Sequence, residues 1–193
     1  MASDLGSSYK YKKVNIKYPT GDIYEGMAAS FLDGEYDEPH GVGTYFHKDS
    51  GVTFKADFEW RRGPDFKTIE IIDKPARKSF VIVRAYASEI YSDLTHLDII
   101  EAKEGTYSFK DLPSFILDPH AWSKHLLTIK KVTDDELVFD FTGPKVDHGN
   151  FVDKVIKKGE PQNYSHTISS HIIWDHDDEY DVDQTAKIDI LYF

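Results

Sequence analysis

Hydrophobic and polar residues alternate along most of this chain with a period of two, which is typical of β-strands with one buried face. Near the N-terminus, Val14, Ile16 and Tyr18 alternate with polar residues. The run from Phe80 to Val83 is apolar and largely β-branched, which favours a strand in the middle of a sheet. Further strands are predicted over 168–174 and 186–193.

A hairpin and two short helices complete the predicted elements. Alternating strands on either side of the charged turn 133–136 predict a hairpin between Leu127 and Phe141. Pro119–Leu127 is predicted as a short helix, capped by the preceding Asp118. Asn150–Lys158 is predicted as another, ending at a glycine. The fold class predicted from these patterns is mainly β and antiparallel.

The distribution of glycine and aromatic residues predicts a division of the chain. Both are dense up to Gly63-Pro64, whereas longer strands and most of the net negative charge follow. We therefore expect a β-hairpin region over 1–64. A β-rich region, a sandwich or a partly open barrel, is expected over 65–193, packed against the first region or continuous with it.

Three short segments of the first region share glycines and aromatic residues at similar spacing. They read GDIYEG at 21–26, HGVGTY at 40–45 and GVTFKADF at 51–58. This pattern resembles the MORN repeat over residues 21–64, about a quarter of the chain. Two features depart from that family. The 30 positions from Tyr24 to Phe54 exceed the length of its usual unit, and Ala56 stands where a glycine is expected in the second unit.

The resemblance implies consecutive hairpins in which Tyr24, Tyr45 and Phe54 share one apolar face, with Gly26, Gly41 and Gly43 at tight backbone positions. It also implies a scaffold that binds a protein partner or associates with itself, and it makes His40 a framework residue. The candidate contact residues are Tyr24, Tyr45, Phe54 and Trp60.

An acidic segment near the C-terminus is the second candidate site. Residues 175–183 contain six acids and neither Lys nor Arg, next to two histidines. Such a row is a solvated turn, a site for a divalent cation, or a contact for a basic partner. The candidate metal ligands are His171, Asp175, His176, Asp177, Glu179 and Asp181.

Composition and charge exclude several classes. The 193-residue chain has a formal net charge of −11 and no cysteine, which excludes disulfides, thiol catalysis and cysteine-ligated zinc. The negative charge argues against nucleic acid and anionic membranes as partners. No apolar run reaches the ~20 residues of a membrane span, and no signal segment is evident, so a cytoplasmic or otherwise intracellular location is expected.

Catalytic signatures are weak. Neither Ser123 with His125 nor Ser165 with His166 is accompanied by a nucleophile elbow, and Gly41-Val-Gly43 lacks the third glycine of a dinucleotide loop. The sequence therefore favours a non-enzymatic interaction or scaffold module without a cofactor. Two alternatives remain open: a β-barrel or sandwich that carries a small ligand, and a metal-dependent hydrolase that uses the His/Asp-rich segment.

Overall fold

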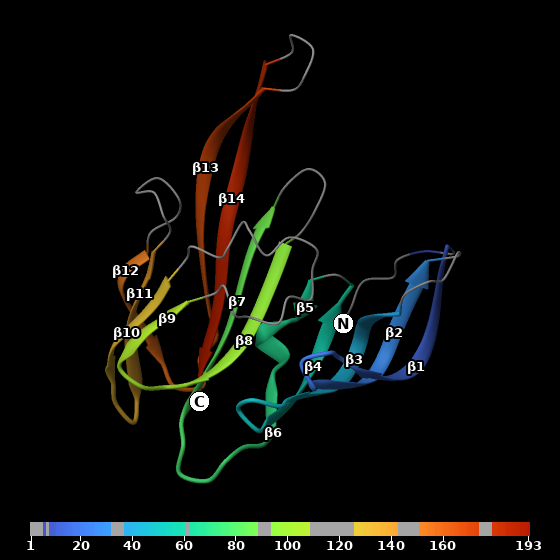
Figure 1. Ribbon diagram of the computed structural model, residues 1–193, viewed down its shortest axis with the longest axis horizontal. Helices are drawn as coiled ribbons and strands as arrows, with labels where there is room; N and C mark the ends of the chain where they lie inside the picture. The colour runs from blue at the N-terminus through green and yellow to red at the C-terminus, as the bar shows by residue number, and fades with distance from the viewer. Residues whose placement is uncertain are drawn as a thin grey trace. The chain divides into compact units, whose positions relative to one another are not determined.

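The computed structural model describes residues 6, 8–31, 37–60, 62–88, 94–108, 126–142, 151–173 and 179–193 (Figure 1). Over these ranges the chain forms antiparallel strands and one 3-10 helix, η1 (Phe66–Thr68), with no α-helix. The predicted mainly β, antiparallel fold is confirmed. None of the described sheets closes into a barrel.

Two compact units make up the molecule. The first comprises Met1–Phe80 with Ile99–Glu101, and the second comprises Val81–Asp98 with Ala102–Phe193. The boundary expected near Pro64 lies inside the first unit, because the chain returns after Pro64 to pair strand β6 with β4.

The first unit is built on a six-stranded sheet in the order β1-β2-β3-β4-β5, with β6 also paired to β4 (Figure 1). Its pairs are antiparallel and follow the chain, as expected for consecutive hairpins. The strands are β1 (Tyr9–Lys17), β2 (Ile23–Phe31), β3 (Glu38–His47), β4 (Val52–Glu59), β5 (Gly63–Pro64) and β6 (Glu70–Asp73).

An aromatic row crosses the buried face of this sheet. Tyr24 of β2 stands directly opposite Tyr45 of β3, and Tyr45 stands opposite Phe54 of β4. The three side chains are at most 1% exposed. Cross-strand neighbours on one face are the pairs through which side chains stabilise a sheet. The predicted common face of Tyr24, Tyr45 and Phe54 is therefore confirmed.

Two glycines make room for the first ring of this row. Gly26 and Gly43 are register partners, and a Cβ at either position would overlap Tyr24. Next to them, a bulge in β3 opposite Met27 interrupts the β2–β3 pairing, and the Tyr24 hydroxyl donates a hydrogen bond to the Met27 carbonyl. The predicted tight positions of Gly26 and Gly43 are confirmed, and Gly41 has a left-handed φ of 90°.

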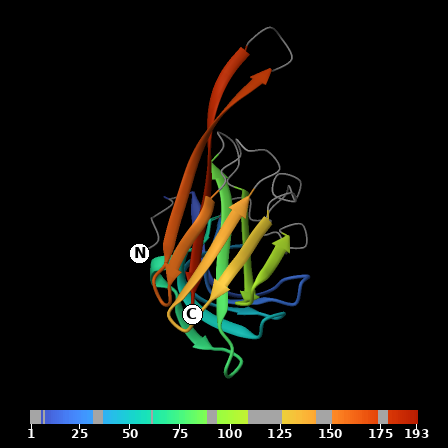
Figure 2. The same ribbon diagram turned by 90° about the vertical axis from the view of Figure 1, so that its left-hand side faces the viewer.

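The second unit contains two four-stranded sheets, in the orders β12-β11-β10-β9 and β13-β14-β7-β8, except that the first residue of β7 and the last three of β8 belong to the first unit. Figure 2 shows the first of them in front of the second. The predicted hairpin is confirmed as β10–β11, and the central strand predicted around Phe80–Val83 is confirmed as β7. The strands are β7 (Phe80–Ser88), β8 (Leu94–Glu101), β9 (Gly105–Ser108), β10 (Leu126–Val132), β11 (Glu136–Thr142), β12 (Phe151–Lys157), β13 (Gln162–Ile173) and β14 (Glu179–Tyr192).

Aromatic side chains join these two sheets into a sandwich. Tyr164 of β13 lies 5.7 Å, between ring centroids, from both Phe139 of β11 and Phe151 of β12. The Tyr192 hydroxyl of β14 donates to the Thr133 carbonyl at 2.6 Å. The core of the second unit therefore lies between its own sheets.

A buried ion pair crosses the second of these sheets. Arg84 of β7 donates from Nε to Asp189 of β14 at 2.9 Å, and Asn163 of β13 donates to the same carboxylate at 2.6 Å. The Arg84 and Asp189 side chains are only 12% and 9% exposed. A buried charge needs such partners, because desolvation without them costs several kcal/mol.

The helix predicted over Asn150–Lys158 is wrong, since Phe151–Lys157 forms strand β12. A bulge gives β12 one extra residue against β11 between Phe139 and Phe141. Phe151 and Ile156 are therefore both buried although they are five positions apart, a spacing that would place them on opposite faces of a regular strand. The other predicted helix falls mostly on residues outside the described ranges, and Leu126 and Leu127 at its end begin β10.

Candidate functional site

Three of the four predicted contact residues are core residues. Tyr24, Tyr45 and Phe54 lie in the buried aromatic row, where their rings hold neighbouring strands together. Burial raises the pKa of Tyr24, and the nearby charge of Asp57 adds to this effect. The Tyr24 phenol therefore stays protonated and keeps donating its hydrogen bond. A binding role for these three residues stays a prediction.

The fourth predicted contact residue, Trp60, belongs to an aromatic cluster at one end of the first unit. Its ring meets the ring of Tyr9 edge to face, with centroids 5.2 Å apart. Its backbone N–H donates to Nδ1 of His40 at 3.1 Å. The His40 ring lies 5.7 Å from that of Tyr11. Tyr9, Tyr11, His40 and Trp60 thus form one connected group, which we call the aromatic cluster.

The position of His40 is that of a framework residue. Its side chain is 4% exposed, and one ring nitrogen is used to hold the chain at the end of β4. The side chain orients Trp60 on one side and supports Tyr11 on the other. This geometry agrees with the framework role expected for His40.

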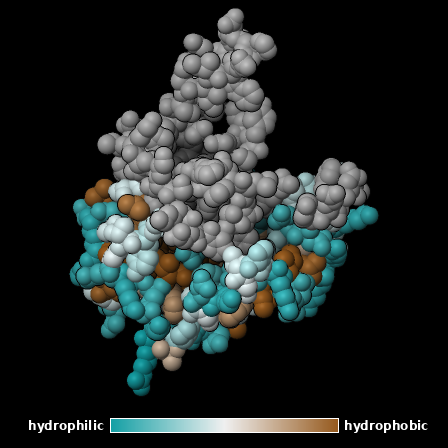
Figure 3. All heavy atoms as spheres, viewed as in Figure 1, coloured by the Kyte–Doolittle hydropathy of each residue, from teal (hydrophilic) through white to brown (hydrophobic). Residues whose placement is uncertain are grey.

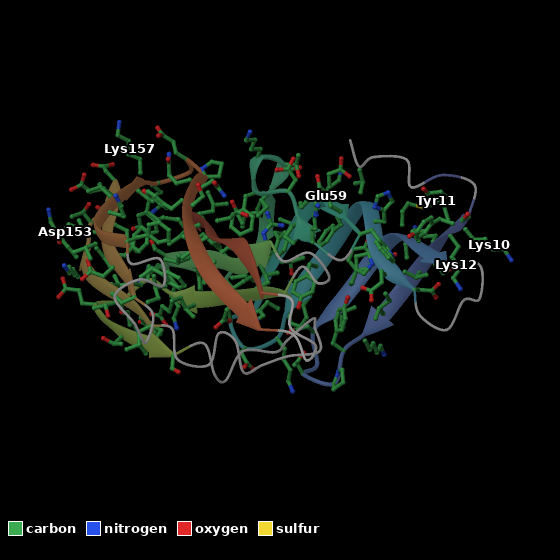
Figure 4. All side chains as sticks on the ribbon, turned by 90° about the horizontal axis from the view of Figure 1, so that it is seen from above. Lys10, Tyr11, Lys12, Glu59, Asp153 and Lys157 are labelled. Carbon is green, nitrogen blue, oxygen red and sulfur yellow. The ribbon has the colours of Figure 1, made fainter. Side chains whose placement is uncertain are left out.

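Strand β1, which carries Tyr9 and Tyr11, is the most basic strand of the described structure. Its nine residues include four lysines and no acid, whereas the whole chain has a net charge of −11. Successive residues project to opposite faces, so Lys10 and Lys12 lie on one face and Tyr11 and Lys13 on the other. Figure 4 shows Lys10, Tyr11 and Lys12 together on β1. All four lysines are exposed, and Tyr11 is 41% exposed.

Among the described residues, the lysines of β1 take part in two exposed ion pairs. Lys12 lies 2.9 Å from Asp37, and Lys13 lies 3.8 Å from Glu25. Exposed pairs of this kind contribute about 0–1 kcal/mol, so these lysines can exchange one carboxylate for another at small cost.

The face that carries Tyr11 and Lys13 also exposes apolar side chains. Met27 is the register partner of Lys13, and Val42 belongs to the part of β3 where the β2–β3 register shifts. Met27 is 38% and Val42 is 54% exposed. The described surface in Figure 3 is mostly hydrophilic with small hydrophobic groups. A mixture of lysine, tyrosine and exposed apolar groups is suited to contact with a protein.

A buried carboxylate fixes the opposite end of the same sheet. Asp22 is 2% exposed and accepts hydrogen bonds from Thr20 Oγ1, Tyr45 Oη and Lys48 N at 2.8–2.9 Å. It therefore joins the β1–β2 turn to the start of the β3–β4 turn. Burial, with smaller effects from Glu38, Tyr24 and Asp22, raises the pKa of nearby Tyr18. These groups give β1 a rigid support.

Half of the candidate metal ligands fall outside the described residues. Asp175, His176 and Asp177 are not among them. The backbone register pairs His171 of β13 with Asp181 of β14, and Ile173 with Glu179. Within the ranges that the structure describes, no three His, Cys, Asp or Glu residues are arranged to hold a metal ion. The divalent-cation site stays a prediction.

Sequence reasoning did not select Tyr9, Tyr11 or the lysines of β1. The signal was present as the run YKYKK, in which lysine and tyrosine alternate within an otherwise acidic chain. The run by itself does not mark a site, because the sequence does not show that β1 is an edge strand.

Comparisons with family models, curated proteins and solved structures returned no match to this chain. The fold and the site define an all-β protein of two units with a basic, aromatic edge strand on the first. In the described part of the chain, no helix is both long and apolar enough to cross a membrane.

Proposed function

We propose that this protein is a non-enzymatic protein-interaction module that contacts its partner through strand β1 and the aromatic cluster. The observation that carries the proposal is a strand with four exposed lysines and an exposed tyrosine at the end of a sheet, in a chain of net charge −11. Charge concentrated against the sign of the whole molecule steers an oppositely charged partner to one place.

The rigidity of the first unit supports the same proposal. The aromatic row, the paired glycines and the Asp22 hydrogen bonds hold β2, β3 and β4 in fixed positions in the sheet that β1 ends. A preorganised surface loses less conformational entropy on binding than a flexible one. The proposal is in line with the scaffold role that the resemblance to the MORN repeat implies.

Site-specific photocrosslinking in lysate of the native cells tests the proposal. Tyr11 is replaced by p-benzoylphenylalanine, and Ile72, a 54% exposed residue of β6, is replaced in a control. We expect a discrete protein adduct from position 11 that is absent from position 72. Light scattering of the purified chain separates a different protein from a second copy. If position 11 gives no adduct and light scattering shows a monomer, the proposal is overturned.

A further inference from the structure

We propose that β1 binds an acidic, extended segment of a partner protein as an added β-strand. The inference rests on the proposed function and adds to it the chemistry of the partner and the mode of contact. Three features of the described structure support it: the position of β1 at the end of a sheet, its charge, and its exposed tyrosine.

The first feature is the sheet edge. Among the described strands, β1 pairs with β2 and with no other, and it ends the order of the sheet (Figure 1). The outer side of an edge strand presents backbone N–H and C=O groups that another extended chain can pair with. Such strand addition is a common mode of peptide recognition.

The second feature is the distribution of charge over β1. Lys10 and Lys12 lie on one face of the sheet and Lys13 and Lys17 on the other. An added strand therefore meets lysines whichever way its side chains project, and acids on both of its faces find partners. Opposite charges on neighbouring strands stabilise the pair, and like charges destabilise it.

The same charges exclude a second copy of β1 as the occupant. Two β1 strands in register would bring four lysines against four lysines with no acid in either strand. Lysines on an edge strand are also a common device against unwanted pairing. Here they repel neutral or basic strands but attract an acidic one, so one set of residues rejects wrong partners and selects the right one.

The third feature is Tyr11. Its ring is 41% exposed and rests against His40, which Trp60 holds through a backbone hydrogen bond. A residue of the added strand beside Tyr11 meets a fixed aromatic surface. Aromatic and β-branched neighbours are favourable cross-strand partners. We therefore expect an acidic segment with one aromatic or β-branched residue in register with Tyr11.

Peptide binding to the full-length protein tests the inference. The probe is a fluorescein-labelled peptide, Glu-Val-Glu-Glu-Phe-Glu-Val-Glu, followed by fluorescence anisotropy at physiological salt. Lys10→Glu with Lys12→Glu is expected to weaken binding by about tenfold or more. Lys55→Glu with Lys157→Glu changes the net charge equally at exposed lysines of β4 and β12, and is expected to change binding by less than about twofold. Lys10→Gln with Lys12→Gln, which adds no acid, is expected to give an intermediate affinity.

Backbone methylation separates strand addition from charge attraction. Two further peptides carry N-methyl groups on alternate amides, one set on each edge of the strand. We expect one of them to lose binding, because its pairing N–H groups are removed, and the other to bind as the parent does. Equal binding of all three peptides would overturn strand addition. So would unchanged binding by the Lys10/Lys12 variants.

Other anions serve as competitors. A DNA oligonucleotide or phosphatidylserine vesicles that displace the peptide with similar affinity would show a general anion surface and overturn the inference. If the peptide does not bind but a protein is crosslinked at position 11, strand addition is rejected and the proposed function stands. Failure of both would reject both.

Discussion

At the scale of single residues, the first unit depends on one tyrosine lying across two glycines. The Tyr24 ring occupies the space above Gly26 and Gly43, where no other residue type leaves room for it. The same ring then contacts Phe58 edge to face at 4.9 Å. The absence of two side chains is thus what allows the aromatic row to be buried.

Gly43→Ala is expected to destabilise the protein by about 1–3 kcal/mol, because the new methyl group overlaps the Tyr24 ring. Thr44→Ala, on the opposite face of β3, is the control and is expected to cost less. Urea unfolding followed by circular dichroism measures both. In the double variant with Tyr24→Leu the two effects are expected to be less than additive. Full additivity, or an unchanged midpoint for Gly43→Ala, would contradict the packing.

Asp22 is the second residue on which the unit depends. Asp22→Ala takes the acceptor away from the Tyr45 hydroxyl and from the Lys48 N–H. A buried donor that loses its acceptor costs about 1–3 kcal/mol, so we expect a loss of at least that size in urea unfolding. Asp49→Ala, an exposed neighbour, is expected to stay within about 0.5 kcal/mol of the wild type. Equal stability of the two variants would exclude the structural role of Asp22.

At the scale of elements, a hydrogen bond and two ion pairs stabilise the bulge in β12. Asp153 has a left-handed φ of 52°, and its N–H donates to Asp140 of β11 at 2.8 Å. Lys130 of β10 lies 2.7 Å from both carboxylates. Burial by itself would raise the pKa of Asp140, but hydrogen bonds from Lys130 and from the Asp153 backbone, with the charge of Lys130, lower it.

This arrangement predicts a pH dependence. Because the pKa of Asp140 is lower in the folded state than in the unfolded state, its contribution to stability is complete above the unfolded value of about 3.9 and is lost as the pH falls through the folded value. Lys130→Met is expected to raise the pKa of Asp140 in a carboxyl-carbon NMR titration. It is also expected to flatten the acid limb of stability below about pH 4.

Lys131→Met removes the neighbouring lysine, which pairs with Glu136 instead, and serves as the control. Its effect on the Asp140 titration should be small. If Asp140 titrates identically in the Lys130→Met variant and in the wild-type protein, this account of the bulge is rejected.

At the scale of the whole molecule, each unit has its own core. The first unit buries the aromatic row on one sheet, and the second buries Phe139, Phe151 and the Arg84–Asp189 pair within its two sheets. Regions with separate cores can open separately, with different free energies.

Asp189→Ala is expected to destabilise the second unit by about 3–5 kcal/mol, since it leaves Arg84 buried without its carboxylate. Glu136→Ala, which removes an exposed ion pair of the same unit, is expected to cost at most about 1 kcal/mol. Amide hydrogen exchange measures the effect. In Asp189→Ala we expect faster exchange in β7 and β14 than in the wild type, and unchanged exchange in β2–β4. Uniform acceleration across both units would contradict separate cores.

The sequence by itself determined the local features of this protein. Period-two alternation is a property of neighbouring residues, so it predicted the β class and the β10–β11 hairpin. An unbroken apolar, β-branched run predicted the central strand β7. The resemblance of the glycine and aromatic pattern to the MORN repeat implied the shared face of Tyr24, Tyr45 and Phe54. The bulged strand β12 escaped this reasoning, because an extra residue shifts the alternation by one position.

Only the tertiary structure decided which strand is an edge and which aromatic residues are buried. Tyr24 and Tyr11 are the same residue type in alternating segments, yet one is fully buried over two glycines and the other is 41% exposed at the end of the sheet. That difference depends on strand order and cross-strand register, which pair residues far apart in the chain. The lysines of β1 form a candidate site for the same physical reason: charge on a strand becomes available to a partner where the sheet ends.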